Sequence, residues 1–107
     1  MKILIVDDEK PIRDVLSAAL RDEGYEVDSA ANGEEGLMKM QTNAPQIVFL
    51  DIWMPGIDGI ETLKQARQKF SQIEFIMISG HGTIETAVKS TKLGAYDFME
   101  KPLSIDK

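Results

Sequence analysis

The chain has 107 residues, 43% of them hydrophobic, which is enough for one domain with a single core. Its formal net charge of -6 argues against binding to nucleic acid or to an anionic membrane surface, because both require basic residues. The absence of cysteine excludes a disulfide framework, a cysteine-based zinc site and a cysteine nucleophile. With no visible signal peptide and no long apolar segment, these properties favour a cytoplasmic protein.

The hydrophobic pattern predicts a strand and then a helix at the start of the chain. Residues 3–6 form a short, fully apolar segment, which is typical of a central strand. Pro11 suits the first turn of the following helix, and Gly24 supplies its end. The predicted inward face of this helix consists of Ile12, Val15, Leu16, Ala19 and Leu20.

A second strand and a second helix are predicted next. Residues 25–30 alternate in polarity, as a half-buried strand does. The helix is expected to begin near Asn32 and to end near residues 43–45. Its inner face is marked by Leu37 and Met40.

Residues 47–50 are four apolar residues in a row and predict a strand that is buried on both faces. This strand stops at Asp51. Pro55 and Gly56 then require a loop, and Asp58 is expected to cap the N-terminus of a third helix. The residues at helical spacing in that helix are Ile60, Leu63, Arg67 and Phe70.

A fourth strand, a fourth helix and a fifth strand complete the pattern. The fourth strand is expected at residues 75–78 and the fifth at residues 96–99. Thr83 is expected to cap the helix between them, which ends at residues 93–95. The residues expected to face inward from this helix are Ala87, Val88 and Thr91.

Strands and helices alternate without a hairpin signal, which predicts an α/β fold. Such a fold has a parallel sheet, right-handed crossovers and helices on both faces. The chain ends where a fifth helix would begin, so the final helix is expected to be missing or truncated. We therefore expect residues 1–107 to be a single domain from the N-terminus of a longer protein, or else to associate through a partly bare sheet face.

The carboxyl ends of parallel strands meet at one edge of a sheet, where open α/β folds place their chemistry. Asp7 and Asp8 follow the first predicted strand, Asp51 the third, Ser79 the fourth and Lys101 the fifth. Two carboxylates about 4 Å apart repel by about 4 kcal/mol at an effective dielectric constant of about 20, so a cation has to offset the repulsion. The lysine is one candidate. A divalent ion is another, and a ligand set made only of oxygens favours Mg²⁺. A site of this kind suits phosphoryl transfer to a carboxylate.

With these residues in place, the chain resembles the receiver domain of a bacterial two-component response regulator. The resemblance covers nearly the whole chain, in the expected order and spacing. Its segments are Ile3-Leu4-Ile5-Val6-Asp7-Asp8-Glu9, Leu50-Asp51-Ile52-Trp53-Met54-Pro55-Gly56-Ile57-Asp58-Gly59, Ser79-Gly80 and Tyr96-Asp97-Phe98-Met99-Glu100-Lys101-Pro102. The resemblance implies a flavodoxin-like (CheY-like), doubly wound sheet of five strands in the order 2-1-3-4-5.

Two further segments resemble the nitrogen-regulation class of response regulators, the NtrC and NtrX type. They are Ser79-Gly80-His81-Gly82-Thr83 and Gly94-Ala95-Tyr96-Asp97-Phe98. In that class the receiver precedes an ATPase domain and a DNA-binding domain. The resemblance therefore implies a sensor histidine kinase as partner and these two output domains in the same protein. It leaves homodimer formation open.

The resemblance also implies a role for each residue at the carboxyl edge. Asp51 is the phosphoryl acceptor, and Lys101 and the Ser79 hydroxyl hold phosphoryl oxygens. Asp8 binds Mg²⁺ directly and Asp7 binds it mainly through water. The remaining ligands come from residue 51 and from the backbone carbonyl of Trp53.

Phe98 occupies the position of a switch aromatic in the fifth strand. The resemblance implies that Phe98 can rotate into the space vacated when Ser79 is drawn toward the phosphoryl group, which would remodel the face of the fourth helix and fifth strand. The resemblance also suggests a cis peptide bond between Lys101 and Pro102.

Trp53 departs from the family pattern, which commonly has a smaller or polar residue at this position. Trp53 and His81 flank the expected phosphoryl site, and we expect both to shield it from water and slow dephosphorylation. His81 is otherwise interpreted as a solvated loop residue without a catalytic role. Taken singly, the other site residues are also ordinary loop, turn or surface residues, and only their combination at one edge favours a functional site.

The predicted function is that of a phosphorylated switch, which promotes its own phosphorylation and hydrolysis but is not a turnover enzyme. One alternative is an aspartyl-phosphate phosphohydrolase, which commonly needs a second Asp at the position that Trp53 occupies. Steady turnover of a phosphate ester would favour that alternative. The other alternative is a pseudo-receiver used only for protein contacts. Asp51→Asn separates it from the switch, because only the switch would lose labelling.

Overall fold

Strands and helices alternate along the chain, as the hydrophobic pattern predicts. The computed structural model describes residues 1–54, 56–80 and 84–100, and the side chains of residues 84–87 and 100 lie outside this description. The elements are β1 (Lys2–Val6), α1 (Lys10–Asp22), β2 (Glu26–Ala30), α2 (Gly33–Asn43), β3 (Ile47–Asp51), α3 (Gly59–Lys69), β4 (Glu74–Ser79), α4 (Ile84–Lys92) and β5 (Asp97–Glu100). None of the helices in the described part of the chain has the length and apolar character needed to cross a bilayer.

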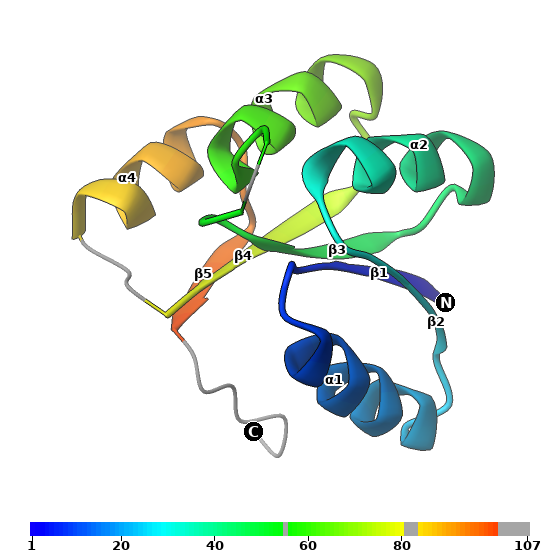
Figure 1. Ribbon diagram of the computed structural model, residues 1–107. Coiled ribbons are helices and arrows are strands. Elements are labelled where there is room, and N and C mark those ends of the chain that lie inside the picture. The colour runs from blue at the N-terminus through cyan, green and yellow to red at the C-terminus, as the bar shows by residue number, and fades with distance from the viewer. Residues whose placement is uncertain (55, 81–83, 101–107) are drawn as a thin grey trace.

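The strands form one parallel sheet in the order β2-β1-β3-β4-β5, which confirms the predicted doubly wound fold (Figure 1). Helix α1 lies on one face of the sheet, and α2, α3 and α4 lie on the other (Figure 1). All strand carboxyl ends therefore meet at a single edge.

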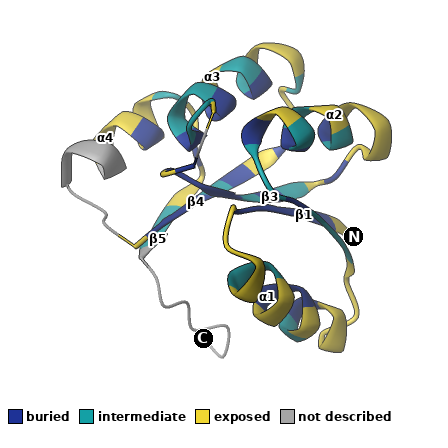
Figure 2. Ribbon diagram, viewed as in Figure 1, coloured by how far each residue is buried: buried dark blue, intermediate teal, exposed yellow. Residues whose placement is uncertain are grey.

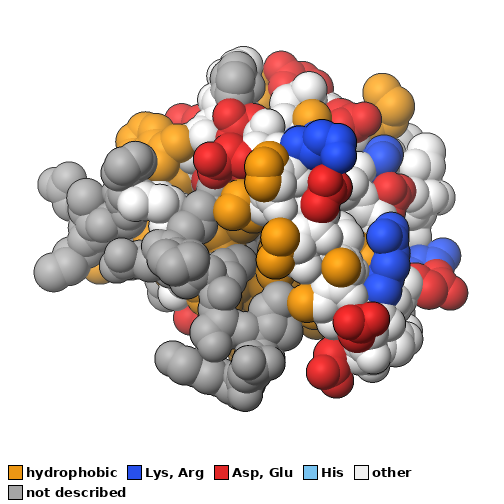
Figure 3. All heavy atoms as spheres, turned by 60° about the horizontal axis from the view of Figure 1, so that its bottom comes forward, with side chains coloured by type: hydrophobic (Ala, Val, Ile, Leu, Met, Phe, Trp, Pro, Cys, Tyr) orange, Lys and Arg blue, Asp and Glu red, His pale blue; other side chains and the backbone are white. Residues whose placement is uncertain are grey.

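The two faces of the sheet carry hydrophobic clusters of different size, and the buried residues lie mainly in the central strands and on the helix turns (Figure 2). The face under α2 and α3 carries the larger hydrophobic cluster, which includes Leu4, Val6, Met40, Val48, Leu50, Leu63, Phe75 and Met77. The face under α1 carries a smaller cluster made of Ile3, Ile5, Leu16 and Leu20. Figure 3 shows hydrophobic side chains at the surface on the side of the molecule that bears α1.

Strand β3 shows this asymmetry within one element. Val48 and Leu50 are fully buried, whereas Ile47 and Phe49 are only half-buried and pack against the smaller cluster. The prediction that this strand is buried on both faces is therefore right for one face and wrong for the other. The reason is that, among the described helices, only α1 covers the second face.

Two of the predicted helix starts are confirmed by side-chain caps. The Asn32 side chain accepts a hydrogen bond from the Glu35 N–H at 2.8 Å, and the Asp58 side chain accepts one from the Glu61 N–H at 2.8 Å. Pro11 lies in the first turn of α1, as expected. The predicted cap at Thr83 lies outside the described residues.

The inward faces of α1 and α4 differ from the prediction. Val15 is 69% exposed and Ser17 is buried, and in α4 Val88 is 47% exposed while Ser90 is fully buried. Thr91, also predicted to face inward, is exposed. The helical spacing of apolar residues predicts only the broad hydrophobic side of a helix. Packing against the sheet decides which part of that side is buried. In both helices a serine, which is small, lies on the buried flank.

Candidate functional site

The predicted acidic residues meet at the carboxyl edge of the sheet. Val6 of β1 pairs with Leu50 of β3, so Asp7 and Asp51 follow at the same level on neighbouring strands. Asp7 is fully buried and Asp51 is 2% exposed, whereas Asp8 faces solvent. The carboxylates of Asp7 and Asp51 are thus buried against the core, and that of Asp8 lies on the solvent side of the site.

One carboxylate oxygen from each of Asp7, Asp8 and Asp51 lies within 4.8 Å of the others. We call these three residues the acidic triad. Their donor atoms are all carboxylate oxygens, which fit a hard divalent cation such as Mg²⁺. The exposed side of the triad also leaves room for the water ligands that Mg²⁺ usually keeps.

Backbone and side-chain hydrogen bonds fix the loop that carries Asp7. The Asp7 N–H donates to the carbonyl oxygen of Ala30 at 3.1 Å, which continues the β1–β2 ladder by one residue. The Asp7 side chain accepts a hydrogen bond from the Glu9 N–H at 2.9 Å. The Asp7 carbonyl oxygen accepts one from the Arg13 guanidinium at 2.8 Å.

Close packing of α3 fixes Asp51. The Gly59 N–H, at the start of α3, donates to the Ile52 carbonyl oxygen at 2.7 Å, and the Ile52 N–H donates to Ile78 of β4 at 3.1 Å. A Cβ atom at Gly59 would overlap with the carbonyl oxygen of Asp51. Glycine is therefore required here by space, because the helix begins directly against the backbone of the acidic residue.

The structure also locates the other predicted site residues that it describes. Ser79 is fully buried at the end of β4, one residue beyond the pairing of Asp51 with Ile78. Trp53 is 53% exposed in the loop after β3. Phe98 of β5 is half-buried and packs against the larger hydrophobic cluster. The expectations for His81, for Lys101 and for the Lys101–Pro102 bond fall outside the described residues.

The sequence predicts no functional role for Arg13 or Gly59, although Arg13 donates a hydrogen bond to the backbone of Asp7 and Gly59 lies directly against the backbone of Asp51. A sequence signal exists for Arg13, which is a cation in the first turns of the helix that follows the Asp7-Asp8 pair. For Gly59 the signal is weaker, because a glycine after a capping aspartate is equally typical of an ordinary turn.

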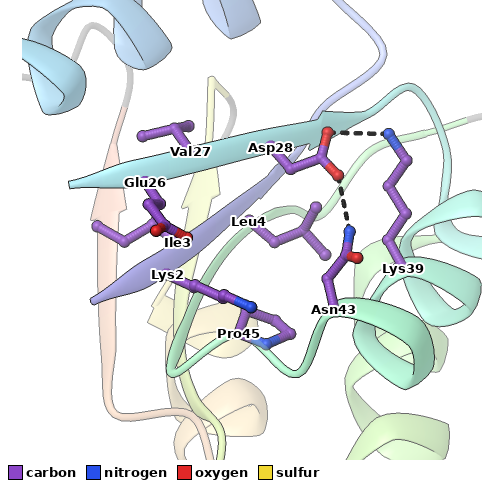
Figure 4. A pocket seen from close by; sticks show the side chains of 9 residues that line it. All are labelled: Lys2, Ile3, Leu4, Glu26, Val27, Asp28, Lys39, Asn43 and Pro45. Carbon is purple, nitrogen blue, oxygen red and sulfur yellow. Dashed lines mark hydrogen bonds and ion pairs between the residues drawn. The ribbon is translucent and has the colours of Figure 1, made fainter.

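A second polar cluster, which we call the Asp28 cluster, lies between β2 and α2 (Figure 4). The Asp28 carboxylate accepts hydrogen bonds from Lys39 at 3.0 Å and from Asn43 at 2.9 Å. Burial raises the pKa of Asp28, but the hydrogen bonds from Lys39, the Ser29 N–H and Asn43, with the charge of Lys39, outweigh this and lower it. The cluster lines a cavity of about 180 Å³ that contains none of the predicted site residues.

Comparison with known proteins matches this chain to one family. Residues 3–107 match the response regulator receiver domain family. The nitrogen assimilation regulatory protein NtrX of Azorhizobium caulinodans is 44% identical over 98% of this chain and 24% of its own length.

Solved structures agree with this match. The crystal structure of NtrX from Brucella abortus superposes with a TM-score of 0.91 at 45% identity, over 98% of this chain and 24% of that one. The crystallised receiver domain of the same protein superposes with a TM-score of 0.89 at 45% identity, over 95% of this chain and 87% of that one. The chemotaxis protein CheY4 of Vibrio cholerae has a TM-score of 0.91 at 32% identity, over 96% of this chain and 88% of that one.

The chain thus spans about a quarter of the length of the NtrX and NtrX-like relatives that it matches, and the matching part is their receiver. Family match, sequence identity and superposition all lead to the same assignment. The chain belongs to the response regulator receiver domain family.

Proposed function

We propose that Asp51 is the phosphoryl acceptor of this two-component receiver domain and that its phosphorylation switches the domain. The observation that carries the proposal is the acidic triad, whose carboxylate oxygens lie within 4.8 Å of one another at the edge of the sheet. Asp51 is held there by β3 and α3, so that its carboxylate is positioned before any partner arrives.

The proposed reaction is an in-line transfer to a carboxylate. An Asp51 carboxylate oxygen forms a bond to phosphorus while the P–N bond of a phosphohistidine, or the P–O bond of a small acyl phosphate, breaks. The leaving imidazole takes up a proton, and acetate leaves as the anion. Asp7, Asp8, Asp51 and the Trp53 carbonyl would hold Mg²⁺, which when bound supplies positive charge opposite the phosphoryl oxygens. The domain would thereby catalyse its own phosphorylation and, with water as nucleophile, its own dephosphorylation.

The proposed switch runs from Ser79 to Phe98. The Ser79 hydroxyl and Lys101 would bind phosphoryl oxygens, and movement of Ser79 would free space beside β4 for Phe98. The β4–β5 register supports this route, because Met77 pairs with Phe98 and Ser79 with the next-but-one residue of β5, Glu100. The surface that changes would then be the face of α4 and β5.

Trp53 and His81 are proposed to set how long the phosphoryl group persists. Trp53 projects from the loop that follows Asp51 and is half exposed, so it can cover a phosphoryl group without being part of the core. The lifetime of phosphorylated Asp51 in Trp53→Asn tests this role. A shorter lifetime is expected, and an unchanged lifetime would contradict shielding by Trp53.

The partners follow from the family. A receiver domain takes its phosphoryl group from a sensor histidine kinase. In the whole protein we propose that the domain controls an ATPase domain and a DNA-binding domain, as the resemblance to the nitrogen-regulation class implies, with association into a dimer as one route of control.

The proposal is tested by intact-mass measurement after incubation with acetyl phosphate, with and without Mg²⁺. The expected result is a gain of one phosphoryl group that requires Mg²⁺ and is absent from Asp51→Asn. Asp14→Asn serves as the matched control, because Asp14 is an exposed carboxylate on α1 that pairs with Lys10. Labelling of Asp51→Asn at the wild-type level would contradict the proposal. Continued release of phosphate from an ester substrate would favour a phosphohydrolase instead.

A further inference from the structure

We infer that Arg13 is a positioning residue for the Mg²⁺ ligands and that it acts through the carbonyl group of Asp7. The inference rests on the proposed function of the acidic triad. It goes beyond that function because Arg13 is neither a metal ligand nor a residue that touches the phosphoryl group.

The first step is the hydrogen bond itself. The Arg13 Nη1 donates to the Asp7 carbonyl oxygen at 2.8 Å, in a partly buried setting. That carbonyl belongs to the peptide between Asp7 and Asp8, so the guanidinium fixes the plane of the bond that joins two members of the triad. A hydrogen bond from a charged donor is among the stronger ones, and its partial burial limits competition from water.

Asp8 is the member of the triad that the sheet holds least firmly. The fully buried Asp7 and the nearly buried Asp51 are held by the sheet, but Asp8 lies on the exposed side of the loop. The Asp8 side chain can remain near the other two carboxylates only if the peptide before it is held in place. The hydrogen bond from Glu9 to the Asp7 side chain fixes one side of this loop, and Arg13 fixes the other.

The guanidinium can affect Mg²⁺ binding in two opposite ways. A guanidinium also carries a positive charge, which would repel Mg²⁺ and weaken its binding if charge were its only contribution. Positioning predicts the opposite effect, because outer-shell groups that orient ligands typically strengthen metal binding about 10- to 100-fold. The direction of change in Mg²⁺ affinity on removal of Arg13 therefore distinguishes the two roles.

The experiment is a Mg²⁺ titration of the purified chain by calorimetry, supported by the fluorescence of its single tryptophan, Trp53. Arg13→Met keeps the aliphatic stem and removes the guanidinium, and we expect its Kd for Mg²⁺ to rise about tenfold. Arg13→Lys keeps the charge but not the planar donor group, and we expect a rise of about threefold.

Arg21 offers a matched control on the same helix. Its guanidinium also donates to a backbone carbonyl, that of Val27 in β2, at 3.0 Å, but the contact is exposed and does not involve the triad. Arg21→Met removes the same charge and the same type of hydrogen bond. We expect its Mg²⁺ affinity to stay within about twofold of wild type, since the described contact of Arg13 is with a triad residue and that of Arg21 is with Val27.

The outcomes separate the inference from the proposed function. Wild-type Mg²⁺ affinity in Arg13→Met, or tighter binding, would overturn the positioning role while leaving the triad intact. An equal loss in Arg21→Met would overturn it too, because the effect would then not depend on the hydrogen bond between Arg13 and the Asp7 carbonyl oxygen. If Arg13→Met does not fold, the test relies on Arg13→Lys. An unchanged Kd for Mg²⁺ in Arg13→Lys would then overturn the inference. A wild-type chain that binds no Mg²⁺ would overturn the proposed function and this inference together.

Discussion

The acidic triad and the Asp28 cluster use carboxylates in opposite ways. Asp28 is surrounded by Lys39 and Asn43, which donate hydrogen bonds to it, and its pKa is lowered as a result. The triad instead gathers three carboxylates around one point. A carboxylate that is satisfied by neighbouring donors joins β2 to α2 and has a structural role. Carboxylates that face one another suit a cation from solution, as we propose for the triad.

The comparison predicts that changes at the triad alter both stability and ligand binding, whereas changes near the Asp28 cluster alter stability alone. Unfolding by urea, with and without Mg²⁺, measures both properties in one experiment.

The largest effect is expected from Gly59→Ala. The new Cβ would overlap with the carbonyl oxygen of Asp51, and backbone cannot move aside as a flexible side chain can. We expect the free energy of unfolding to fall by about 3 kcal/mol or more, with loss of Mg²⁺ binding. Gly24→Ala is the control: Gly24 has φ +94° but open space around it, so a loss of only about 1 kcal/mol is expected. Equal losses in the two variants would show that α3 does not press on Asp51.

The next effect concerns stabilisation by Mg²⁺. A cation that binds only the folded state at 100 times its Kd raises the free energy of unfolding by about 2.7 kcal/mol. Asp8 is exposed, so Asp8→Ala should fold normally and lose this gain. Asp14→Ala, an exposed carboxylate outside the triad, should keep it. Full stabilisation of Asp8→Ala by Mg²⁺ would remove Asp8 from the ligand set.

A smaller effect is expected at Ala44, which ends α2 directly after Asn43 of the Asp28 cluster. Its φ of 46° lies in the left-handed region that favours glycine. Ala44→Gly relieves this strain but frees the unfolded chain, so a net gain of about 0.5 kcal/mol is expected. The Kd for Mg²⁺ should not change. A shift in that constant would show that the two regions are coupled.

The smallest effect is the pH dependence that Asp28 adds to stability. Because its pKa is lower in the folded than in the unfolded state, its contribution is present above the unfolded pKa of about 3.9 and is lost as the pH falls through the lower folded value. The side chain is 47% exposed, so the contribution should stay below about 0.5 kcal/mol. Urea unfolding of Asp28→Asn should show a flatter acid limb than wild type. Identical acid limbs would contradict the stabilising role of the cluster.

The sequence contains most of the fold and most of the candidate site. The short apolar segments before Asp7 and Asp51 predict strands, and the parallel arrangement of these strands places both residues at one edge. Capping at Asn32 and Asp58 is local chemistry, so it too could be predicted. Features that depend on local chemistry, such as strand ends and helix caps, could therefore be predicted from the sequence.

The remaining features depend on three-dimensional contacts. Val15 and Ser17 lie two positions apart on α1 and therefore on different sides of the helix, and the packing against the sheet decides that the serine is buried and the valine exposed. Arg13 reaches Asp7 across six positions of the chain, a contact that depends on how α1 leaves the loop. The same holds for Gly59, whose importance lies in its distance to another backbone segment.

The central claim is that the acidic triad makes residue 51, and no other carboxylate, the phosphoryl acceptor. It is tested most directly by treating the phosphorylated chain with borohydride, which reduces an aspartyl phosphate to homoserine, and locating the change by peptide mass spectrometry. The account predicts homoserine at position 51 alone, and only in samples phosphorylated with Mg²⁺ present. Homoserine at Asp7, at Asp8 or at a carboxylate outside the triad would contradict it.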